Sequence, residues 1–211
     1  MGDRVQKVMD GDEFLLWCLD QDDRYELVNG IPAKMMAGAS EIHDLLVVNV
    51  IAALHRQLRG SRCRPTTANI AVRTRIRNYR RPDVTVTCGP TPRADRFDAE
   101  EPKMVVEVLS PSNVGLDWQR KIEEYRTHPT LRYILLIDTK RAGATLLSRA
   151  ELGWTDSNFD DMSDMIELPD VACQWLMFMR APRFPKPKTY SAPVALHLTC
   201  GPGAMAGRTR D

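Results

Sequence analysis

Residues 102–112, PKMVVEVLSPS, contain a short apolar run with one acid, Glu107, in its middle. The length of this run and its valines predict a β-strand that is buried on both faces. Burying a carboxylate without a partner is costly, so the Glu107 side chain must be paired with a cation, protonated or bound to a metal ion. The run therefore predicts a covered strand with a polar site inside it.

The segments around this strand predict an α/β domain with a mixed β-sheet flanked by helices. Asn29-Gly30 separates two alternating segments and favours a tight hairpin turn, because both residues tolerate positive φ. Ser40 and Asp117 are the expected N-caps of two helices. Helices are expected over residues 12–20, 41–59 and 117–126, and further strands over residues 69–77, 83–87 and 131–138, with a small strand group over residues 144–170.

The length of 211 residues favours one domain, which we place at residues 1–180. Residues 181–211 are rich in proline and glycine and are expected to form a disordered tail. The longest nearly apolar run, residues 45–54, is too short to cross a bilayer, so no membrane partner is expected. The acidic N-terminus argues against a secretory signal and favours a cytoplasmic protein.

The cysteines of the chain are scattered, odd in number and form no C-x-x-C pair. Such spacing argues against a disulfide framework and against a zinc site. We therefore expect reduced thiols at Cys18, Cys63, Cys88, Cys173 and Cys200.

The net charge of +1 hides a strong asymmetry along the chain. Residues 45–82 contain nine arginines and no Asp, Glu or Lys, whereas residues 151–170 contain seven acids and no Lys or Arg. The arginine segment is either a surface for a polyanion or a solvated face that the acidic segment balances. Within it, the period of two places Arg73, Arg75 and Arg77 on one strand face, where they can meet anions, and Val72, Thr74 and Ile76 on the other.

Asp83 stands at the start of the apolar strand expected over residues 83–87. If this strand and the Glu107 strand are neighbours in the sheet, their carboxylates converge, and such oxygen ligands suit Mg²⁺ or Mn²⁺. Lys121 lies in the apolar stripe of the following helix, which should face the sheet. Its ammonium could lie beside Glu107 and stabilise charge on a phosphate, or its stem could pack while the head reaches solvent.

Five short motifs follow one another along the chain: RYELVNG with Glu26, SEIH with His43, RRPDVTV with Asp83, MVVEVLSPSN with Glu107 and DWQRKIEEYR with Lys121. Together they resemble the Uma-type family of restriction endonucleases, within the PD-(D/E)XK nuclease superfamily. The resemblance covers residues 12–170. It implies a restriction-endonuclease-like core with a mixed sheet, in which Asp83 and Glu107 carry a divalent metal ion.

The same resemblance implies roles for other residues. In the superfamily pattern a Lys follows the Glu by two positions, but this chain has Leu109 there, so the role would pass to Lys121 on the helix. The carbonyl of Val108 is implied as a further metal ligand. Glu26 is implied as an additional catalytic carboxylate, although its hairpin position alone favours an exposed side chain. His43 would bond a neighbouring group as a neutral side chain, or act as a base or ligand.

These features lead to one main functional hypothesis. It is a Mg²⁺- or Mn²⁺-dependent endonuclease that hydrolyses phosphodiester bonds in DNA, with Arg73, Arg75 and Arg77 contacting phosphates. The alternatives are a nucleic-acid-binding or assembly module that keeps the fold without catalysis, and a structural oligomer without a nucleic-acid role. The resemblance also implies a homodimer.

Overall fold

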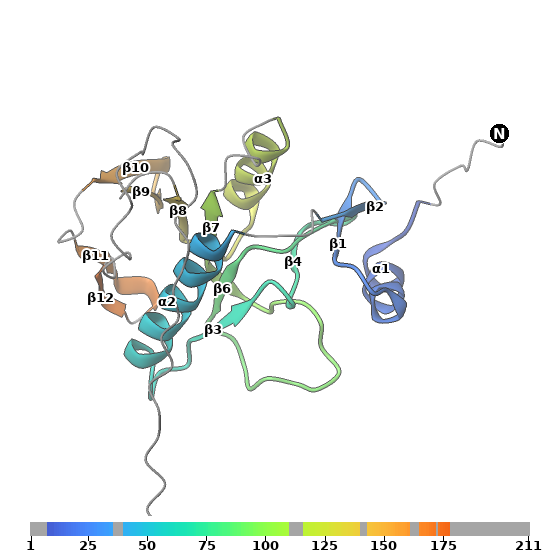
Figure 1. Cartoon of the computed structure of the whole chain (residues 1–211), viewed down its shortest axis with the longest axis horizontal. Coiled ribbons are helices and arrows are strands. Elements are labelled where there is room, and N and C mark those ends of the chain that lie inside the picture. The colour runs from blue at the N-terminus through green and yellow to red at the C-terminus, as the bar shows by residue number, and fades with distance from the viewer. Residues whose placement is uncertain are drawn as a thin grey trace, which may run out of the picture.

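The computed structural model describes residues 8–35, 40–109, 116–139, 143–160, 165–171 and 173–177. In Figure 1 a main sheet with helices beside it adjoins a smaller layer formed by the N-terminal part of the chain. The predicted tail at residues 181–211 lies outside the described residues, and so does its boundary with the domain.

The main sheet has six strands in the order β10-β9-β8-β7-β6-β3. The strand that contains Glu107 is β7, which pairs parallel with β8 and antiparallel with β6. The other pairs are antiparallel, so the sheet is mixed and the predicted α/β fold class is confirmed. The strands are β3 (Arg64–Thr67), β6 (Val84–Thr87), β7 (Pro102–Leu109), β8 (Tyr133–Asp138), β9 (Gly143–Ala150) and β10 (Gly153–Phe159).

Helix α2 (Glu41–Gln57) covers one face of the main sheet (Figure 1). Ser40 caps this helix as predicted, because its Oγ accepts a hydrogen bond from the backbone N–H of His43 at 3.2 Å. The buried side chains of Val50 and Leu54 belong to the same core cluster as Val106 of β7. This packing fixes the helix on the sheet, and with it the first turn that carries His43.

Helix α3 (Leu116–Thr127) covers the opposite face of the main sheet. Tyr125 of α3 packs there with Val105 of β7. Since side chains alternate along a strand, Glu107 shares this face with Val105. Asp117 lies inside the first turn of α3, so its predicted position as the N-cap was wrong because the helix begins earlier.

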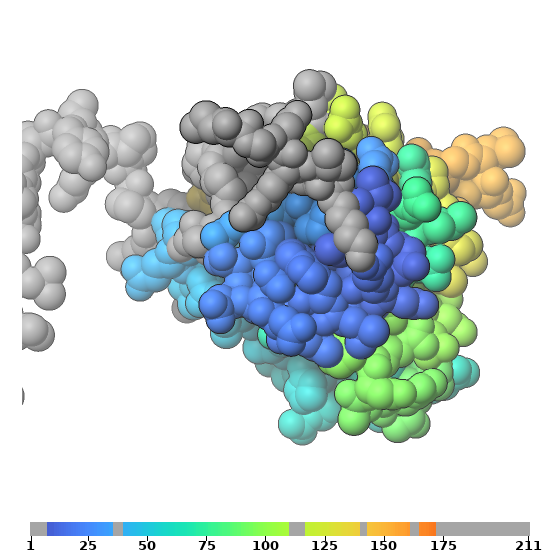
Figure 2. All heavy atoms as spheres, turned by 90° about the vertical axis from the view of Figure 1, so that its right-hand side faces the viewer, coloured from blue at the N-terminus to red at the C-terminus, as the bar shows by residue number. Residues whose placement is uncertain are grey.

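A second sheet, in the order β2-β1-β5-β4, contains the N-terminal part of the chain. β1 and β2 form the predicted hairpin, in which Asn29 and Gly30 have φ values of 52° and 83°. Val72 of β4 reaches the core under α3, so this sheet lies on the α3 side of the main sheet. Figure 2 shows residues 8–35 of this part as a dark blue surface over one side of the molecule. Its elements are α1 (Gly11–Trp17), η1 (Cys18–Asp20), β1 (Tyr25–Val28), β2 (Ile31–Lys34), β4 (Val72–Arg75) and β5 (Asn78–Arg80).

The strand expected over residues 69–77 is shorter than predicted. The burial of side chains alternates within β4, where Arg73 and Arg75 are exposed. The strand ends there, and Ile76 is 74% exposed in the turn before β5. Ile76 therefore does not share the buried face of Val72 and Thr74, and its predicted place on that face was wrong. Arg77 shares no strand face with the other two arginines, because the chain turns at this point.

Cys63 and Cys88 form a disulfide, which corrects the expectation of reduced thiols for this pair. The antiparallel register of β3 and β6 pairs Arg64 with Thr87, so the two cysteines stand opposite each other one position further along. Their separation of 25 residues in the sequence gives no sign of this pairing. Cys18 is a free thiol. Disulfides are rare in reducing compartments, and the cytoplasmic location stays a prediction.

The last described elements are β11 (Met165–Leu168), η3 (Pro169–Val171) and β12 (Cys173–Met177). β11 and β12 pair antiparallel in a separate two-stranded sheet, and Ile166 and Leu168 join the core beneath α2. The predicted late strand group is thus present, with β9 and β10 at the edge of the main sheet. Within the described residues, no helix has the length and apolar character needed to cross a membrane.

His128 follows α3, is buried, and gives the fold a predicted sensitivity to acid. Burial, together with the charges of Arg149 and Lys103, lowers the pKa of His128 from 6.5 to about 4. As the pH falls from 6.5 through 4, the unfolded state binds a proton that the folded state does not, so stability is lost. We expect His128 to contribute a fall of about 2 to 3 kcal/mol in the free energy of unfolding over this range, measured by urea unfolding as the difference between the parent and a variant without this histidine.

Two histidine variants separate this effect from general acid unfolding. His128→Gln should lose less stability over the same pH range than the parent protein. His55→Gln replaces an exposed histidine of α2 and should behave like the parent. Equal losses in both variants would contradict the assignment to His128.

Candidate active site

Asp83, which directly precedes β6, stands opposite Glu107 of the neighbouring strand β7, as expected if their carboxylates converge. The antiparallel register of β6 and β7 pairs Val84 with Val106, and Asp83 and Glu107 lie one step beyond this pair. The Oδ2 atom of Asp83 accepts a hydrogen bond from the backbone N–H of Val108 at 2.7 Å. This bond ties the start of β6 to the strand that carries Glu107.

Glu107 is a buried carboxylate, 8% exposed, with an unusual affinity for its proton. The hydroxyl of Tyr125 donates a hydrogen bond to its Oε1 at 2.7 Å. Burial, with the charges of Asp83 and Glu26, raises the pKa of Glu107 from 4.5 to about 7, against the opposing effects of Lys121 and of the Tyr125 hydrogen bond. A cation beside these carboxylates would therefore stabilise the ionised form of Glu107.

The backbone of β7 directs the carbonyl of Val108 to the same place. The N–H and C=O groups of one strand residue point to one side, and those of the next residue point to the other. The N–H of Val108 faces Asp83, whereas the carbonyl of Leu109 accepts a hydrogen bond from Thr139 on the β8 side. The Val108 carbonyl therefore lies on the side of β6 and Asp83.

His43, in the first turn of α2, contacts the same aspartate. Its Nε2 lies 3.3 Å from Oδ2 of Asp83. This hydrogen bond raises the pKa of His43 above its ordinary value, against the effect of burial. The Nδ1 atom is buried and has no hydrogen-bond partner among the described residues. His43 thus bonds a neighbouring group, Asp83, and helps to orient it, whereas the raised pKa favours the protonated form over the neutral one that the sequence alternative assumed.

Lys121 points into the protein and forms an ion pair with Glu26. Its Nζ lies 2.9 Å from Oε1 of Glu26, and its side chain is 15% exposed. Burial lowers the pKa of Lys121, but Glu107 and Glu26 outweigh it and hold the pKa above its ordinary value. The ammonium is therefore charged and bound inside the site, and the alternative with its head in solvent does not describe this lysine.

Glu26 is buried in β1, contrary to the exposed position that the hairpin alone favours. Burial raises the pKa of Glu26. The charges of Lys121 and Arg80 and the hydrogen bond from the N–H of Arg81 together lower it by more, so the pKa lies below its ordinary value. Its Oε1 accepts from Lys121 at 2.9 Å and from the N–H of Arg81 at 3.0 Å. Its Oε2 accepts from Nη1 of Arg80 at 3.0 Å. Glu26 thus joins the N-terminal sheet to α3.

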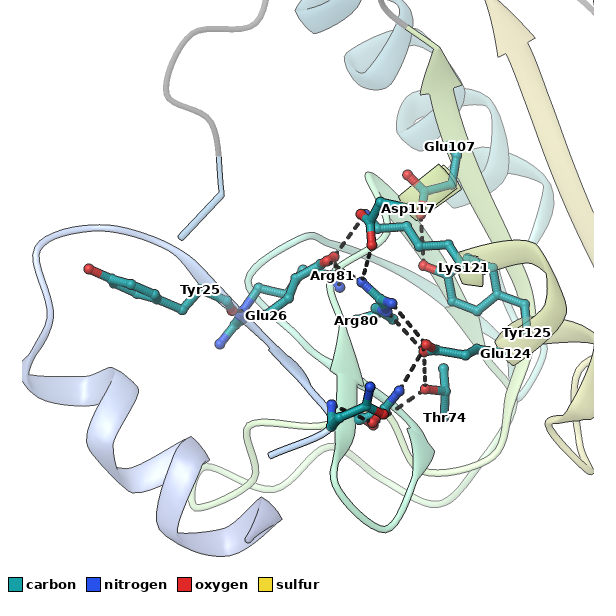
Figure 3. Close-up of polar contacts among 12 residues, drawn as sticks. Tyr25, Glu26, Thr74, Arg80, Arg81, Glu107, Asp117, Lys121, Glu124 and Tyr125 are labelled. Atoms are coloured by element: carbon teal, nitrogen blue, oxygen red, sulfur yellow. Dashed lines mark hydrogen bonds and ion pairs between the residues drawn. The ribbon is translucent and has the colours of Figure 1, made fainter. Parts of the chain in front are cut away.

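Arg80 and Glu124 form a buried pair that sequence reasoning missed (Figure 3). Nε and Nη2 of Arg80 bind the two oxygens of Glu124 at 2.9 and 2.8 Å. The same carboxylate accepts from Thr74 Oγ1 at 2.7 Å and from Asn78 Nδ2 at 2.8 Å. Nη1 of Arg80 also lies 3.3 Å from Oδ1 of Asp117.

Weak signals for this pair exist in the sequence. Thr74 falls on the inward face of β4 by the period of two, and Glu124 lies three residues after Lys121, on the same face of the helix. Neither signal identifies Arg80 as their partner. Arg80 is instead one arginine among nine in a segment that composition assigns to a surface, yet its side chain is fully buried.

The arginines expected to contact phosphates stand apart from this cluster. Thr74 faces Glu124, so its strand neighbours Arg73 and Arg75 point to the opposite face of β4. Arg77 lies in the turn before β5, where its carbonyl accepts a hydrogen bond from the N–H of Gly30. The structure brings Glu26, His43, Asp83, Glu107 and Lys121 together, with the backbone of Val108, and it leaves these three arginines outside.

The donor set fits a hard divalent cation. No group of three or more His, Cys, Asp or Glu side chains could hold a metal ion in the part of the chain that the structure describes. Mg²⁺ commonly needs only one or two carboxylates, because waters and substrate phosphates complete its shell. The carboxylates of Asp83 and Glu107, with the carbonyl of Val108, are oxygen donors of this kind.

Comparison with known proteins identifies the family and the fold of the chain. An uncharacterized protein, slr1290, from Synechocystis sp. (strain ATCC 27184 / PCC 6803 / Kazusa) is 30% identical over 162 residues, which span 76% of this chain and 84% of that protein. The crystal structure of a protein from Anabaena variabilis ATCC 29413, titled a putative nuclease belonging to DUF820, matches with a TM-score of 0.60. That match covers 76% of this chain and 89% of the other at 17% identity, so it concerns the fold.

A family model matches residues 12–177, a range that contains every residue of the site described above. Its description is "Uma2: Putative restriction endonuclease". The nuclease-like fold and this match agree with each other. The chain therefore belongs to the Uma2 family of restriction-endonuclease-like proteins.

Proposed function

We propose that the protein is a Mg²⁺- or Mn²⁺-dependent endonuclease that hydrolyses phosphodiester bonds in DNA. The observation that carries the proposal is the position of Asp83, at the start of β6, opposite Glu107 on β7, with the charged Lys121 near Glu107. Membership of a family described as restriction endonucleases supports the same reaction class. A homodimer on duplex DNA remains part of this proposal.

The proposed roles follow from the contacts of each side chain. Asp83, Glu107 and the Val108 carbonyl would hold the metal ion, and Asp83 is oriented by His43. When bound, the ion would supply charge neutralisation at the phosphate and a more acidic water. The ammonium of Lys121 would donate a hydrogen bond to a phosphate oxygen or to the attacking water.

The direct test is a cleavage assay with purified protein. Supercoiled plasmid, linear duplex and single-stranded DNA are incubated with Mg²⁺, with Mn²⁺ and with a chelator, and the products are separated on gels. We expect cleavage with either metal ion and none with the chelator. Salt-dependent DNA binding without cleavage on any substrate would reject the endonuclease and favour the non-catalytic binding module.

Arg73 and Arg75 give a separate prediction about DNA binding. Because both side chains are exposed and point away from Glu124, they would attract DNA without acting at the reacting phosphate. The double variant Arg73→Gln/Arg75→Gln should lower the slope of log affinity against log salt by roughly 1 to 2 units. The cleavage rate at saturating DNA should stay unchanged.

A matched control lies at the far end of α2. Arg59 is exposed just beyond that helix, whose 17 residues separate it from His43 by roughly 25 Å at 1.5 Å per residue. Arg59→Gln should leave the salt slope unchanged. If the double variant binds DNA with the parent's slope, these arginines do not contact the DNA.

A further inference from the structure

The site depends on one carboxylate that connects two parts of the fold. Glu26 belongs to β1 of the N-terminal sheet, whereas Lys121 belongs to α3. Within the described residues, Glu26 accepts from the ammonium of Lys121, the guanidinium of Arg80 and the backbone N–H of Arg81. The position of the Lys121 ammonium is therefore only as well defined as the position of the Glu26 carboxylate.

Arg80 fixes that carboxylate because its own orientation is fully determined. Its guanidinium is completely buried and binds Glu124 through two nitrogens, which leaves Nη1 directed at Glu26. Glu124 is held in turn by Thr74 and Asn78 at the β4–β5 hairpin. A continuous set of hydrogen bonds thus runs from this hairpin to Lys121 (Figure 3).

The same cluster also fixes the segment that leads to Asp83. The side chain of Arg81 donates to the carbonyls of Tyr25, Ala68 and Asn69. Its backbone N–H donates to Glu26, and Asp83 follows two residues later. Both the metal-binding aspartate and the lysine are therefore located relative to one group of buried charges.

We propose that Arg80 and Glu124 are positioning residues that hold the Lys121 ammonium in the site through Glu26. The proposal deepens the endonuclease function given above and rests on it for the role of Lys121 in cleavage. Neither residue touches the reacting phosphate. A cluster that only stabilises the fold would leave the ammonium of Lys121 undisturbed in any variant that remains folded.

The first readout requires neither metal nor DNA. A ¹H–¹⁵N spectrum of the lysine ammonium groups, recorded on the whole metal-free chain at low temperature, should show a protected signal that disappears in Lys121→Arg. In Glu124→Gln, which keeps the shape of the side chain but removes its charge, exchange of these protons with water should be at least about tenfold faster. Tenfold corresponds to about 1.4 kcal/mol, roughly the value of one hydrogen bond to a charged group.

Two further variants keep the test decisive. Thr74→Val removes one hydrogen bond to Glu124 with little change in shape and should speed the exchange in the same direction, even if Glu124→Gln folds poorly. Thr74→Ser retains the hydroxyl and should restore the parent signal. Glu123→Gln changes the exposed neighbour of Glu124 on α3 and should have no effect.

The outcomes separate this inference from the proposed function. An unchanged Lys121 signal in folded Glu124→Gln and in Thr74→Val would overturn the positioning role. A parent protein that cleaves no DNA but shows the expected ammonium changes would reject the endonuclease and keep the positioning of Lys121. If the parent cleaves DNA, Thr74→Val should lower kcat with KM unchanged, and equal kcat values would overturn the role in catalysis.

Discussion

Replacing Glu107 with glutamine will lower the rate of DNA cleavage by at least about 100-fold and leave the protein folded. Glutamine matches the volume of Glu107 and can still accept the hydrogen bond from Tyr125, but it cannot supply an anionic oxygen to a metal ion. Asp83→Asn should cause a similar loss, since it removes the opposing carboxylate. Single-turnover cleavage of one labelled duplex measures both effects.

The stability of the metal-free protein gives an independent check on Glu107. In the folded protein the carboxyl of Glu107 has a pKa of about 7, whereas in the unfolded chain its pKa is near 4.5. Ionisation of Glu107 therefore destabilises the folded state relative to the unfolded state. Its contribution to the free energy of unfolding falls as the pH rises from 4.5 through 7. By linkage Glu107 contributes a fall of about 3 kcal/mol, which appears as the difference between the parent and Glu107→Gln in urea unfolding with a chelator present.

The exposed Glu123 provides the control for both measurements. Glu123→Gln should cleave DNA at the parent rate and show the parent's pH dependence of stability. If Glu107→Gln cleaves as fast as this control, Glu107 is a buried structural acid and not part of a catalytic site.

The strand and hairpin around the site were predictable because they depend on local patterns. The apolar run around Glu107 predicted its strand, and the positive-φ pair Asn29-Gly30 predicted its turn, since both constraints act within a few residues. The face of α3 that carries Lys121 followed from helical periodicity. Each of these predictions needed no knowledge of which elements become neighbours.

Contacts between distant segments were not predictable in the same way. The partner of Lys121 is Glu26, which lies on a strand whose place beside α3 depends on how the N-terminal sheet packs. The disulfide between Cys63 and Cys88 likewise depends on the register of β3 with β6. Such pairings are fixed by tertiary packing, which the spacing of residues along one chain does not encode locally.

Arg80 is the clearest example of this limit. Its neighbours in the sequence are basic, so composition assigns it to a solvated face or a polyanion surface. The structure instead buries it against Glu26 and Glu124. These two acids stand 54 and 44 residues away in the sequence, so only the folded arrangement of β1, β5 and α3 brings the three charges together.

Replacing Arg80 with methionine will lower the free energy of unfolding by about 3 to 5 kcal/mol. The change removes the buried cation, and among the described residues it leaves Thr74 and Asn78 as the hydrogen-bond partners of the Glu124 carboxylate. Burial of an uncompensated charge is the dominant cost, because methionine fills much of the same volume. Urea unfolding measures the loss, and Arg75→Met, at an exposed position of β4, should change stability by less than about 0.5 kcal/mol.

A double variant distinguishes the charge from the packing. If the loss in Arg80→Met comes from the unpaired carboxylate, Arg80→Met/Glu124→Leu should recover at least about 1 kcal/mol relative to the sum of the single losses. Glu26 stays paired with Lys121 and with the N–H of Arg81 in this variant, so only the Glu124 charge is relieved. Additive losses would mean that Arg80 stabilises the fold by filling space, and the buried charges would then act independently of one another.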